Sequence, residues 1–471
     1  MIDQDLATYT IGELVPLLRT REVSPVHVVQ ACLDRVERLN GTLCAYTTVL
    51  AEPALHQARE AERALAKGES RSLLHGIPVS VKDVCATRGI RTTWGARFLA
   101  TYCPPGDSTV VVKLREAGAI LLGKTNVDTY PYDGSPGSPR LIGPTRNPWD
   151  LARTAGRSSG GSAASVAASL DFGSIGSDNG GSIRIPAALC GVVGLKPTFG
   201  RVSKYRVFPY SDSFDHCGPL ARSVYDCAAL LGAIAGHDPK DATTVDRPVH
   251  DYVGGLEQPV RGLRAGVARV AWEGNDPEVT RLVGEAIEVV SSLGLTMRDT
   301  DLPGLDHALW ADAVGAAEIN AMAEELAPRP TPANPYAAYM LERSQAFRQR
   351  VFDEGMGIVQ AVRQAYAEIF RHIDLLVLPT VPITAPLLTE ETSPWTRADE
   401  VFVEMPARYT RLFNLIGYPA ISVPCGYASD GMPVGVQIAG RPFEEEILLR
   451  VAHRYEQATD WHLRHPSPPL K

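Results

Sequence analysis

The chain has 471 residues, enough for one large core or for two or three ordinary domains. Hydrophobic residues make up 45% and charged residues 21%, an ordinary globular composition, and the formal net charge is −8. This charge gives no sign of a surface for polyanions, and no apolar run approaches the ~18 residues of a membrane span. We therefore expect no nucleic acid and no membrane among the partners.

The cysteines and histidines argue against the common metal sites. Eight cysteines are scattered without a C-x-x-C pair, and none of the eleven histidines belongs to an H-E-x-x-H motif. The first residues, MIDQDLATYT, contain neither the basic nor the apolar part of a secretory signal. We expect a cytoplasmic protein with no metal, no cofactor and no disulfide framework.

Signals for helices and strands alternate from the start of the chain. Ser24 and Pro25 predict the N-cap and the first residue of a helix, and a second helix is predicted over 53–67. The segment HGIPVSVKDV then alternates between apolar and polar residues. This pattern predicts a strand with Lys82 near its C-terminal end.

The alternation continues to the C-terminus. Ser223 and Asp226 form a capping-box pattern that predicts another helix. Further helices are predicted over 108–117 and 162–170, and strands over 119–122, 172–177, 192–198, 263–271, 373–382, 419–426 and 434–440. The fold class is therefore α/β. We predict one large domain over 1–471, with a helical N-terminal region (1–70), a catalytic core (71–240), a more helical variable cap region (270–370) and a C-terminal return to the sheet (371–471).

The stretch GAILLGKT, Gly118–Thr125, matches the phosphate-loop pattern G-x-x-x-x-G-K-[ST]. The four residues between its glycines are apolar, which is typical of a buried strand and not of a solvated loop. The segment that follows contains three prolines and two glycines, so it predicts no helix for a phosphate to bind. We interpret Lys124 as a structural or site-edge lysine.

The segment from Arg153 to Gly191 is rich in glycine and serine, and we interpret it as the part that carries chemistry. Local composition alone also fits a linker or tight turns. Two glycines in its second half permit positive φ angles, so that successive backbone N–H groups can converge on an oxyanion beside a serine hydroxyl. This predicted oxyanion hole consists of Asn179, Gly180, Gly181 and Ser182, with Asp178 and Arg184 bracing the turn.

A serine nucleophile at Ser182 needs a base. Residues alone leave two candidates, His216 in a polar stretch and Lys82 at the end of its strand, with Ser158 or Ser159 as a proton relay. A lysine acts as a base only when it is neutral, which requires burial or nearby positive charge. A strand-end lysine is otherwise an ordinary solvated charge.

A rival interpretation starts from GRSSG, Gly156–Gly160, which fits the nucleophile-elbow pattern G-x-S-x-G. Ser158 would then be the nucleophile, with His216 or His237 as its base. The elbow needs an apolar strand that runs directly into the serine. The preceding RNPWDLARTA is polar and contains a proline, which disfavours this interpretation.

The chain resembles the amidase signature family. The resemblance rests on NPWDLARTAGRSSGGSAA, GSDNGGSIRIPAALCGVVGLKPT and the PVSVKD strand, and it extends through LLGKTN, DHCGPLARSV, PAISVPCG and MPVGVQIAGRPFEE. It implies a single large domain with a central mixed β-sheet covered on both faces by α-helices. It also implies a Ser–cis-Ser–Lys triad, with Ser182 as the acyl-forming nucleophile, Ser158 as the relay after a cis peptide bond, and Lys82 as the base.

Some positions depart from the common pattern of this family. Arg157 replaces a frequent glycine, Asn179 stands where threonine or isoleucine is frequent, and VDTYPYDG follows GKTN in place of an acidic-aromatic run. None of these changes removes a catalytic group. We expect the last one to reshape the pocket for the acyl group.

The resemblance implies an amidase that forms an acyl-enzyme on a small carboxamide, such as an amide, aryl amide, hydrazide or carbamate. We expect a free-standing enzyme, and the family also suggests a homodimer. The alternative is the glutaminase subunit of a tRNA-dependent amidotransferase complex, but Ala407 occupies the position where that branch has an acidic residue. A catalytically silent binding protein is a third hypothesis, which retention of Lys82, Ser158 and Ser182 disfavours.

Overall fold

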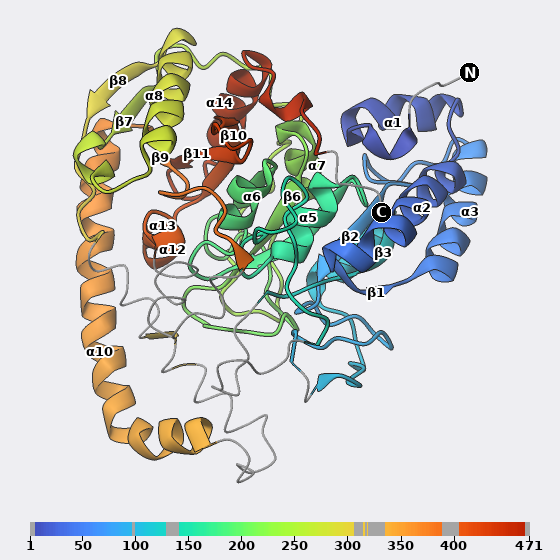
Figure 1. Cartoon of the computed structure of the whole chain (residues 1–471), viewed down its shortest axis with the longest axis horizontal. Coiled ribbons are helices and arrows are strands. Elements are labelled where there is room, and N and C mark those ends of the chain that lie inside the picture. Colours follow the sequence, from blue (N-terminus) through green and yellow to red (C-terminus); the bar gives the residue numbers. More distant parts are fainter. Residues whose placement is uncertain are drawn as a thin grey trace.

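The computed structural model describes residues 5–96, 99–128, 141–305, 314–315, 318, 335–388 and 405–466. Its elements, labelled in Figure 1, are α1 (Ile11–Thr20), α2 (Pro25–Leu43), β1 (Tyr46–Val49), α3 (Ala51–Ala66), β2 (Pro78–Lys82), α4 (Thr109–Glu116), β3 (Ile120–Thr125), α5 (Gly160–Ala167), β4 (Gly173–Asp178), α6 (Arg184–Cys190), β5 (Val193–Lys196), β6 (His216–Ala221), α7 (Val224–Ile234), β7 (Arg264–Val267), α8 (Pro277–Ser292), β8 (Thr296–Asp299), α10 (Pro335–His372), β9 (Leu375–Pro379), α12 (Met405–Ala407), α13 (Arg411–Ile416), β10 (Ala420–Tyr427), β11 (Pro433–Gly440) and α14 (Glu445–Gln457), with short 3-10 helices at Leu6–Thr8, Arg269–Trp272 and Trp461–Leu463.

The strands form one sheet of eleven strands in the order β1-β3-β2-β4-β6-β5-β10-β11-β9-β7-β8. β2 lies between β3 and β4 and is parallel to both, whereas β4 and β6 are antiparallel. The sheet is therefore mixed, as the family resemblance implied. Figure 1 shows α1, α2 and α3 at one end of the molecule and β7, β8 and α8 at the other.

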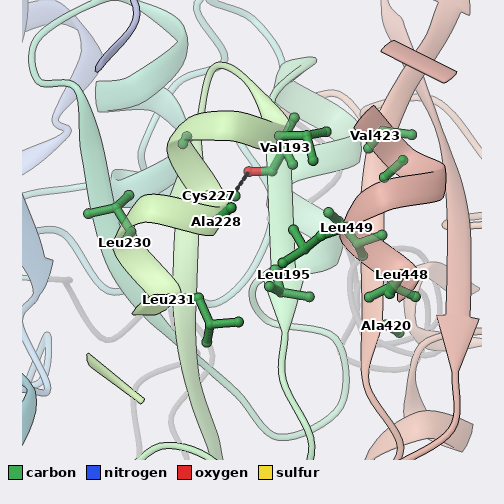
Figure 2. Close-up of a cluster of buried hydrophobic side chains, with 14 of the residues drawn as sticks. Val193, Leu195, Cys227, Ala228, Leu230, Leu231, Ala420, Val423, Leu448 and Leu449 are labelled. Carbon is green, nitrogen blue, oxygen red and sulfur yellow. Dashed lines mark hydrogen bonds between the residues drawn. The ribbon is translucent and has the colours of Figure 1, made fainter. Parts of the chain in front are cut away.

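Helices cover both faces of this sheet, and β6 shows how. Alternate residues of a strand point to opposite faces. Leu220 packs into a cluster with residues of α5 and α6, while the next residue, Ala221, packs into the cluster that contains α7. Figure 2 shows the second cluster, where Leu448 and Leu449 of α14 lie between β5, with Val193 and Leu195, and β10, with Ala420 and Val423. The predicted architecture is confirmed.

Local signals placed the helix starts well. Ser24 caps α2 by accepting a hydrogen bond from the N–H of Val26, with Pro25 at the first helical position. Ser223 caps α7 by accepting from the N–H of Asp226 at 3.1 Å. In both cases a side-chain oxygen satisfies an N–H group that has no partner within the helix.

Three elements of the core were not predicted from the sequence. They are β1, β6 and α6. Strand β6 contains Gly218 and Pro219, which local propensity disfavours in a strand, but it is buried throughout between β4 and β5. Tertiary packing overrides local preference here. Among the described residues, no helix is long and apolar enough to cross a membrane.

Candidate active site

Lys82 is the last residue of β2, in the interior of the sheet, and its side chain is buried. Its Nζ donates hydrogen bonds to the hydroxyls of Ser158 at 2.6 Å and Ser177 at 2.9 Å. No carboxylate of the described residues forms an ion pair with it. Burial lowers the pKa of Lys82 to about 8, although Cys85 and Asp178 act in the opposite direction. A neutral amine is therefore accessible near neutral pH.

Ser158 lies in a tight segment between the loop 141–157 and α5. The peptide bond between Arg157 and Ser158 is cis, as the resemblance implied. Gly156 has φ +92°, and a Cβ there would lie 2.8 Å from the Cα of Pro186, so only glycine fits this approach to α6. The carbonyl of Ser158 accepts a hydrogen bond from the N–H of Asp128 at 2.9 Å.

Ser159 joins the two serine segments. Its N–H donates to the carbonyl of Ser182 at 3.2 Å, and its hydroxyl donates to the carbonyl of Ser177 at 3.1 Å. Ser159 itself is fully buried, whereas Ser158 and Ser182 are half-buried. The structure thus brings Lys82, Ser158 and Ser182 together, with Ser159 linking the two serine segments. Ser158 and Ser182 are both accessible to solvent.

The turn that carries Ser182 follows β4 and is shaped by Gly181. Gly181 has φ +127°, and a Cβ there would lie 2.1 Å from the hydroxyl oxygen of Thr410. Thr410 holds the turn by donating to the carbonyl of Gly180 at 2.7 Å. The carboxylate of Asp178 accepts from the N–H of Gly181 at 2.8 Å and from that of Ile183 at 3.1 Å.

Of the backbone N–H groups in the predicted oxyanion hole, one is hydrogen-bonded within the turn and three are not. The N–H of Gly181 is engaged by Asp178 inside the turn. For Asn179, Gly180 and Ser182, no acceptor among the described residues contacts the backbone N–H. All three are half-buried, so these N–H groups can serve a ligand.

Asp178 and Arg184 form a fully buried ion pair behind the turn. Nη2 and Nε of Arg184 donate to the two oxygens of Asp178 at 2.9 and 3.1 Å. Burial raises the pKa of Asp178, but the Arg184 guanidinium outweighs it and holds that pKa below its usual value. Asn414 donates to Asp178 at 2.8 Å, and Arg184 also donates to Asn414 at 2.7 Å and to Gln437 at 2.8 Å. Every charge is paired, so this network fixes the turn.

The histidine candidates for a base lie in unsuitable surroundings. His216 is in β6 opposite Asp178, its Nδ1 lies 2.6 Å from the carbonyl of Phe214, and its Nε2 has no partner among the described residues. Burial and the nearby Lys196 hold the pKa of His216 well below its usual value. His237 is exposed, and its Nδ1 lies 3.1 Å from the hydroxyl of Thr244. The described residues 141–157 contain only isolated bridges before Ser158, which is not the strand an elbow requires.

The phosphate-loop match is a buried strand, as predicted. β3 includes Lys124, whose Nζ donates to the carbonyl of Cys85 at 2.6 Å and to Thr92 at 2.8 Å. It also forms an ion pair with Asp83 at 3.3 Å, and both side chains are inaccessible to solvent. Lys124 therefore stabilises the loop that follows Lys82.

Sequence reasoning missed the polar residues that hold the site from a distance: Ser177, Thr410, Asn414 and Gln437. The signal for Ser177 was present, because a hydroxyl in a buried strand needs a partner. The other three lie more than 200 residues from Ser182, and nothing in their neighbourhood marks them. The segment 129–140, expected to shape the acyl pocket, and most of the cap region between 306 and 334 lie outside the described residues.

The fold agrees with comparisons to known proteins. The model of the family described as Amidase matches residues 27–449, so the chain belongs to the amidase family and is an amidase-signature hydrolase. The chain is 39% identical to a glutamyl-tRNA(Gln) amidotransferase subunit from Geobacter sp. (strain M21), covering 97% of this chain and 98% of that one. Its identity to the protein of the same name from Moorella thermoacetica is 40%, covering 98% and 99%. The solved structure of 6-aminohexanoate cyclic dimer hydrolase superposes with a TM-score of 0.86 at 31% identity, covering 98% and 99%.

These comparisons correct one expectation. The acidic net charge and the family resemblance predicted a small amide substrate, no nucleic acid and at most a second copy of the chain as partners. Relatives that match over the whole chain are named as subunits of a glutamyl-tRNA(Gln) amidotransferase, which contradicts that prediction. Net charge failed as a guide because it describes the whole surface and not the contacts of one face. The relatives' names favour the alternative function over the free-standing enzyme.

Proposed function

We propose that the chain hydrolyses a carboxamide through an acyl-enzyme on Ser182. The observation that carries the proposal is the buried Lys82 amine, 2.6 Å from Ser158 and without an acidic partner among the described residues. Neutral Lys82 takes the proton of Ser158 while Ser158 takes that of Ser182, whose Oγ attacks the carbonyl carbon. The C–N bond breaks as the departing nitrogen receives a proton back along this chain. Water then attacks the ester, and Ser182 is released.

The negative charge that develops on the carbonyl oxygen is met by backbone N–H groups of the Ser182 turn. We assign this role to Asn179, Gly180 and Ser182, since the N–H of Gly181 is bound to Asp178. Donors fixed in advance stabilise such an oxyanion without reorganisation, and each contributes about 2.7–4 kcal/mol. The Asp178–Arg184 pair supplies the rigidity that this role demands.

Labelling with a fluorophosphonate tests the mechanism directly. We expect covalent labelling of Ser182 in the intact chain, lost in Ser182→Ala and strongly slowed in Lys82→Ala. A label that maps elsewhere, or no label at all, would show that the roles are wrongly assigned. The variant Ser169→Ala is a matched control, since Ser169 is a buried serine outside the site and its loss should leave labelling unchanged.

Two settings for this chemistry are supported by different observations. The relatives named as glutamyl-tRNA(Gln) amidotransferase subunits support a glutaminase that supplies ammonia within a complex. Ala407 packs in an apolar cluster with Ile185 and Val381, at the position where the glutaminase branch has an acidic residue. This apolar environment supports an amide substrate that carries no amino group. A panel of glutamine, aryl amides, hydrazides and carbamates, assayed for the released amine, distinguishes the two. Glutaminase activity stimulated by charged tRNA would support the first. Cytoplasmic location and dimer formation remain predictions from the sequence and the family.

A further inference from the structure

A cavity of about 270 Å³ lies one residue away from Lys82. Ser177, which accepts the second hydrogen bond of Lys82, forms part of its wall. Asp215, another lining residue, accepts a hydrogen bond at 3.0 Å from the side chain of Asn179, whose backbone we assigned to the oxyanion hole. The cavity is therefore lined by residues that contact both the proposed base and the proposed oxyanion hole.

Two cations, Lys204 and Arg206, line this cavity and are not neutralised by an ion pair with any described residue. Lys204 is held over the ring of Phe199 at 4.8 Å and donates one hydrogen bond, at 2.6 Å, to the backbone carbonyl of Asp212. An ammonium group has three donors, so two of them stay available to a ligand. The guanidinium of Arg206 is exposed and lies against the ring of Tyr205.

Of the two acidic residues that line the cavity, Asp212 and Asp215, the second is engaged elsewhere. One oxygen of Asp215 accepts from Asn179 at 3.0 Å. The other accepts from the N–H groups of Tyr210 at 2.6 Å and Ser211 at 2.9 Å. Asp215 is thus used to fold the loop 210–215 and to hold Asn179, and it forms no ion pair with Lys204 or Arg206, both among the described residues.

The backbone conformation of Arg206 is one that an arginine rarely adopts, and the neighbouring chain leaves room for its side chain. Its φ is +56°, in the left-handed region that favours glycine. Hydrogen bonds fix this conformation, because the carbonyl of Arg206 accepts from the N–H of Ala86, and the N–H of Phe208 donates to the carbonyl of Val84. The guanidinium of Arg206 packs against Gly106. A Cβ on residue 106 would lie 1.5 Å from the Nη1 of Arg206, so a side chain at this position would occupy the same space. A strained residue at a cavity wall is characteristic of a functional position.

We propose that Lys204 and Arg206 form a subsite for a carboxylate carried by the amide substrate, on the half that extends from Ser182 into this cavity. The inference rests on the proposed amide hydrolysis and specifies its substrate class as ω-carboxy amides. A planar guanidinium and an ammonium suit a carboxylate. The nearby Asp212 and Asp215 disfavour a doubly charged phosphate, because like charges at close range repel.

The test compares succinamate and glutaramate with the uncharged amides of equal length, butyramide and valeramide, in the wild-type chain and in Arg206→Gly and Lys204→Met. Glycine is the natural residue for φ +56°, so Arg206→Gly removes the charge without strain. We expect the wild type to prefer the carboxylate substrates by about 10- to 100-fold in kcat/KM, and each variant to lose about tenfold of that ratio. The matched control is Arg21→Gly, an exposed arginine with φ +64° at the end of α1, which should leave the ratio unchanged.

Binding measured without turnover separates the two proposals. In the Ser182→Ala background, calorimetry with glutaramate should give a Kd that rises about tenfold when Arg206→Gly is added. A wild-type chain that hydrolyses amides with no preference for a carboxylate overturns the subsite and leaves the hydrolase intact. A chain that hydrolyses no amide, but binds glutaramate through Arg206, retains the subsite and overturns the proposed function. Binding that does not depend on Arg206 and Lys204 overturns the subsite in either case.

Discussion

Lys82 and Lys124 are buried lysines on adjacent parallel strands, and they differ in what surrounds the amine. In the register of β2 and β3, Val81 pairs with Lys124 and Lys82 with Thr125, so the two residues are offset by one position. Lys124 contacts a carboxylate, a carbonyl and a hydroxyl. Lys82 contacts two hydroxyls. Burial lowers the pKa of both amines, although Asp83 opposes this at Lys124.

The difference shows that burial does not by itself make a lysine a base. A carboxylate partner keeps an ammonium charged and structural, whereas hydroxyl partners accept or return a proton without fixing the charge. The strand that matched a nucleotide-binding pattern therefore carries the structural lysine, and the proposed base lies on the adjacent strand. The predictions below separate these two roles.

The largest expected effect is on turnover. Lys82→Met should lower kcat/KM by about 10³-fold or more, since a positioned base contributes about 10²–10⁴-fold. Because Lys82 and Ser158 act as one unit, adding Ser158→Ala to Lys82→Met should cost little more. Steady-state assays on the best amide of the panel give these values. Independent, multiplicative losses in the double variant would contradict a shared proton path.

The second effect is on the free energy of unfolding, which we expect to depend more on Lys124 than on Lys82. Lys124→Met leaves the buried Asp83 carboxylate without its cation and should lower the free energy of unfolding by about 3–5 kcal/mol. Lys82→Met removes a buried cation that has no ion pair and should cost far less. Urea denaturation, followed by circular dichroism, measures both. A greater loss of stability in Lys82→Met would mean that Lys82 is the structural residue.

The third effect is the pH dependence of turnover. Lys82 acts when neutral, and its pKa is about 8, so kcat/KM should rise about tenfold per pH unit below that value and level off above it. The folded pKa lies below that of the unfolded chain, where the lysine binds its proton up to about 10.5. The contribution of Lys82 to stability should accordingly increase between pH 8 and 10.5, and the difference in stability between wild type and Lys82→Met should change by that amount over this range. A pH profile without a limb near 8 would exclude Lys82 as the group that titrates.

The smallest effect concerns Ser177. Ser177→Ala removes one of the two hydroxyls that stabilise the charged amine, so the pKa of Lys82 should fall and the limb should move to lower pH. The loss in kcat/KM at the plateau should stay below about tenfold. Ser177→Thr retains the hydroxyl and should restore the wild-type profile. A limb that does not move in Ser177→Ala would show that this contact leaves the titration of Lys82 unaffected.

The sequence predicted the α/β class and most element positions because helix caps and alternating strands are local signals, as at Ser24 and Ser223. It failed at β6, whose Gly218 and Pro219 lack strand propensity and are placed by neighbouring strands. The proposed triad followed from resemblance, whereas the residues alone left His216 open as a candidate base. Only its position in the core, with Nδ1 against a carbonyl, excludes it. Likewise, the engagement of the Gly181 N–H by Asp178 is a three-dimensional fact that no motif contains.

The hydrogen-bond network of Arg184, which holds the turn of Ser182, has a consequence for the synthesis of the protein. Arg184 contacts Asn414 and Gln437, which lie 230 and 253 residues later in the chain. At a synthesis rate of about 5–20 residues per second, the ribosome needs roughly 10 to 50 seconds to deliver these partners after Arg184 has emerged. During that interval the proposed nucleophile, Ser182, has been synthesised, but Asn414 and Gln437 are not yet present to hold its turn. We therefore expect a nascent chain to be inert towards amides until its last strands are in place, so that hydrolytic activity would report completed synthesis.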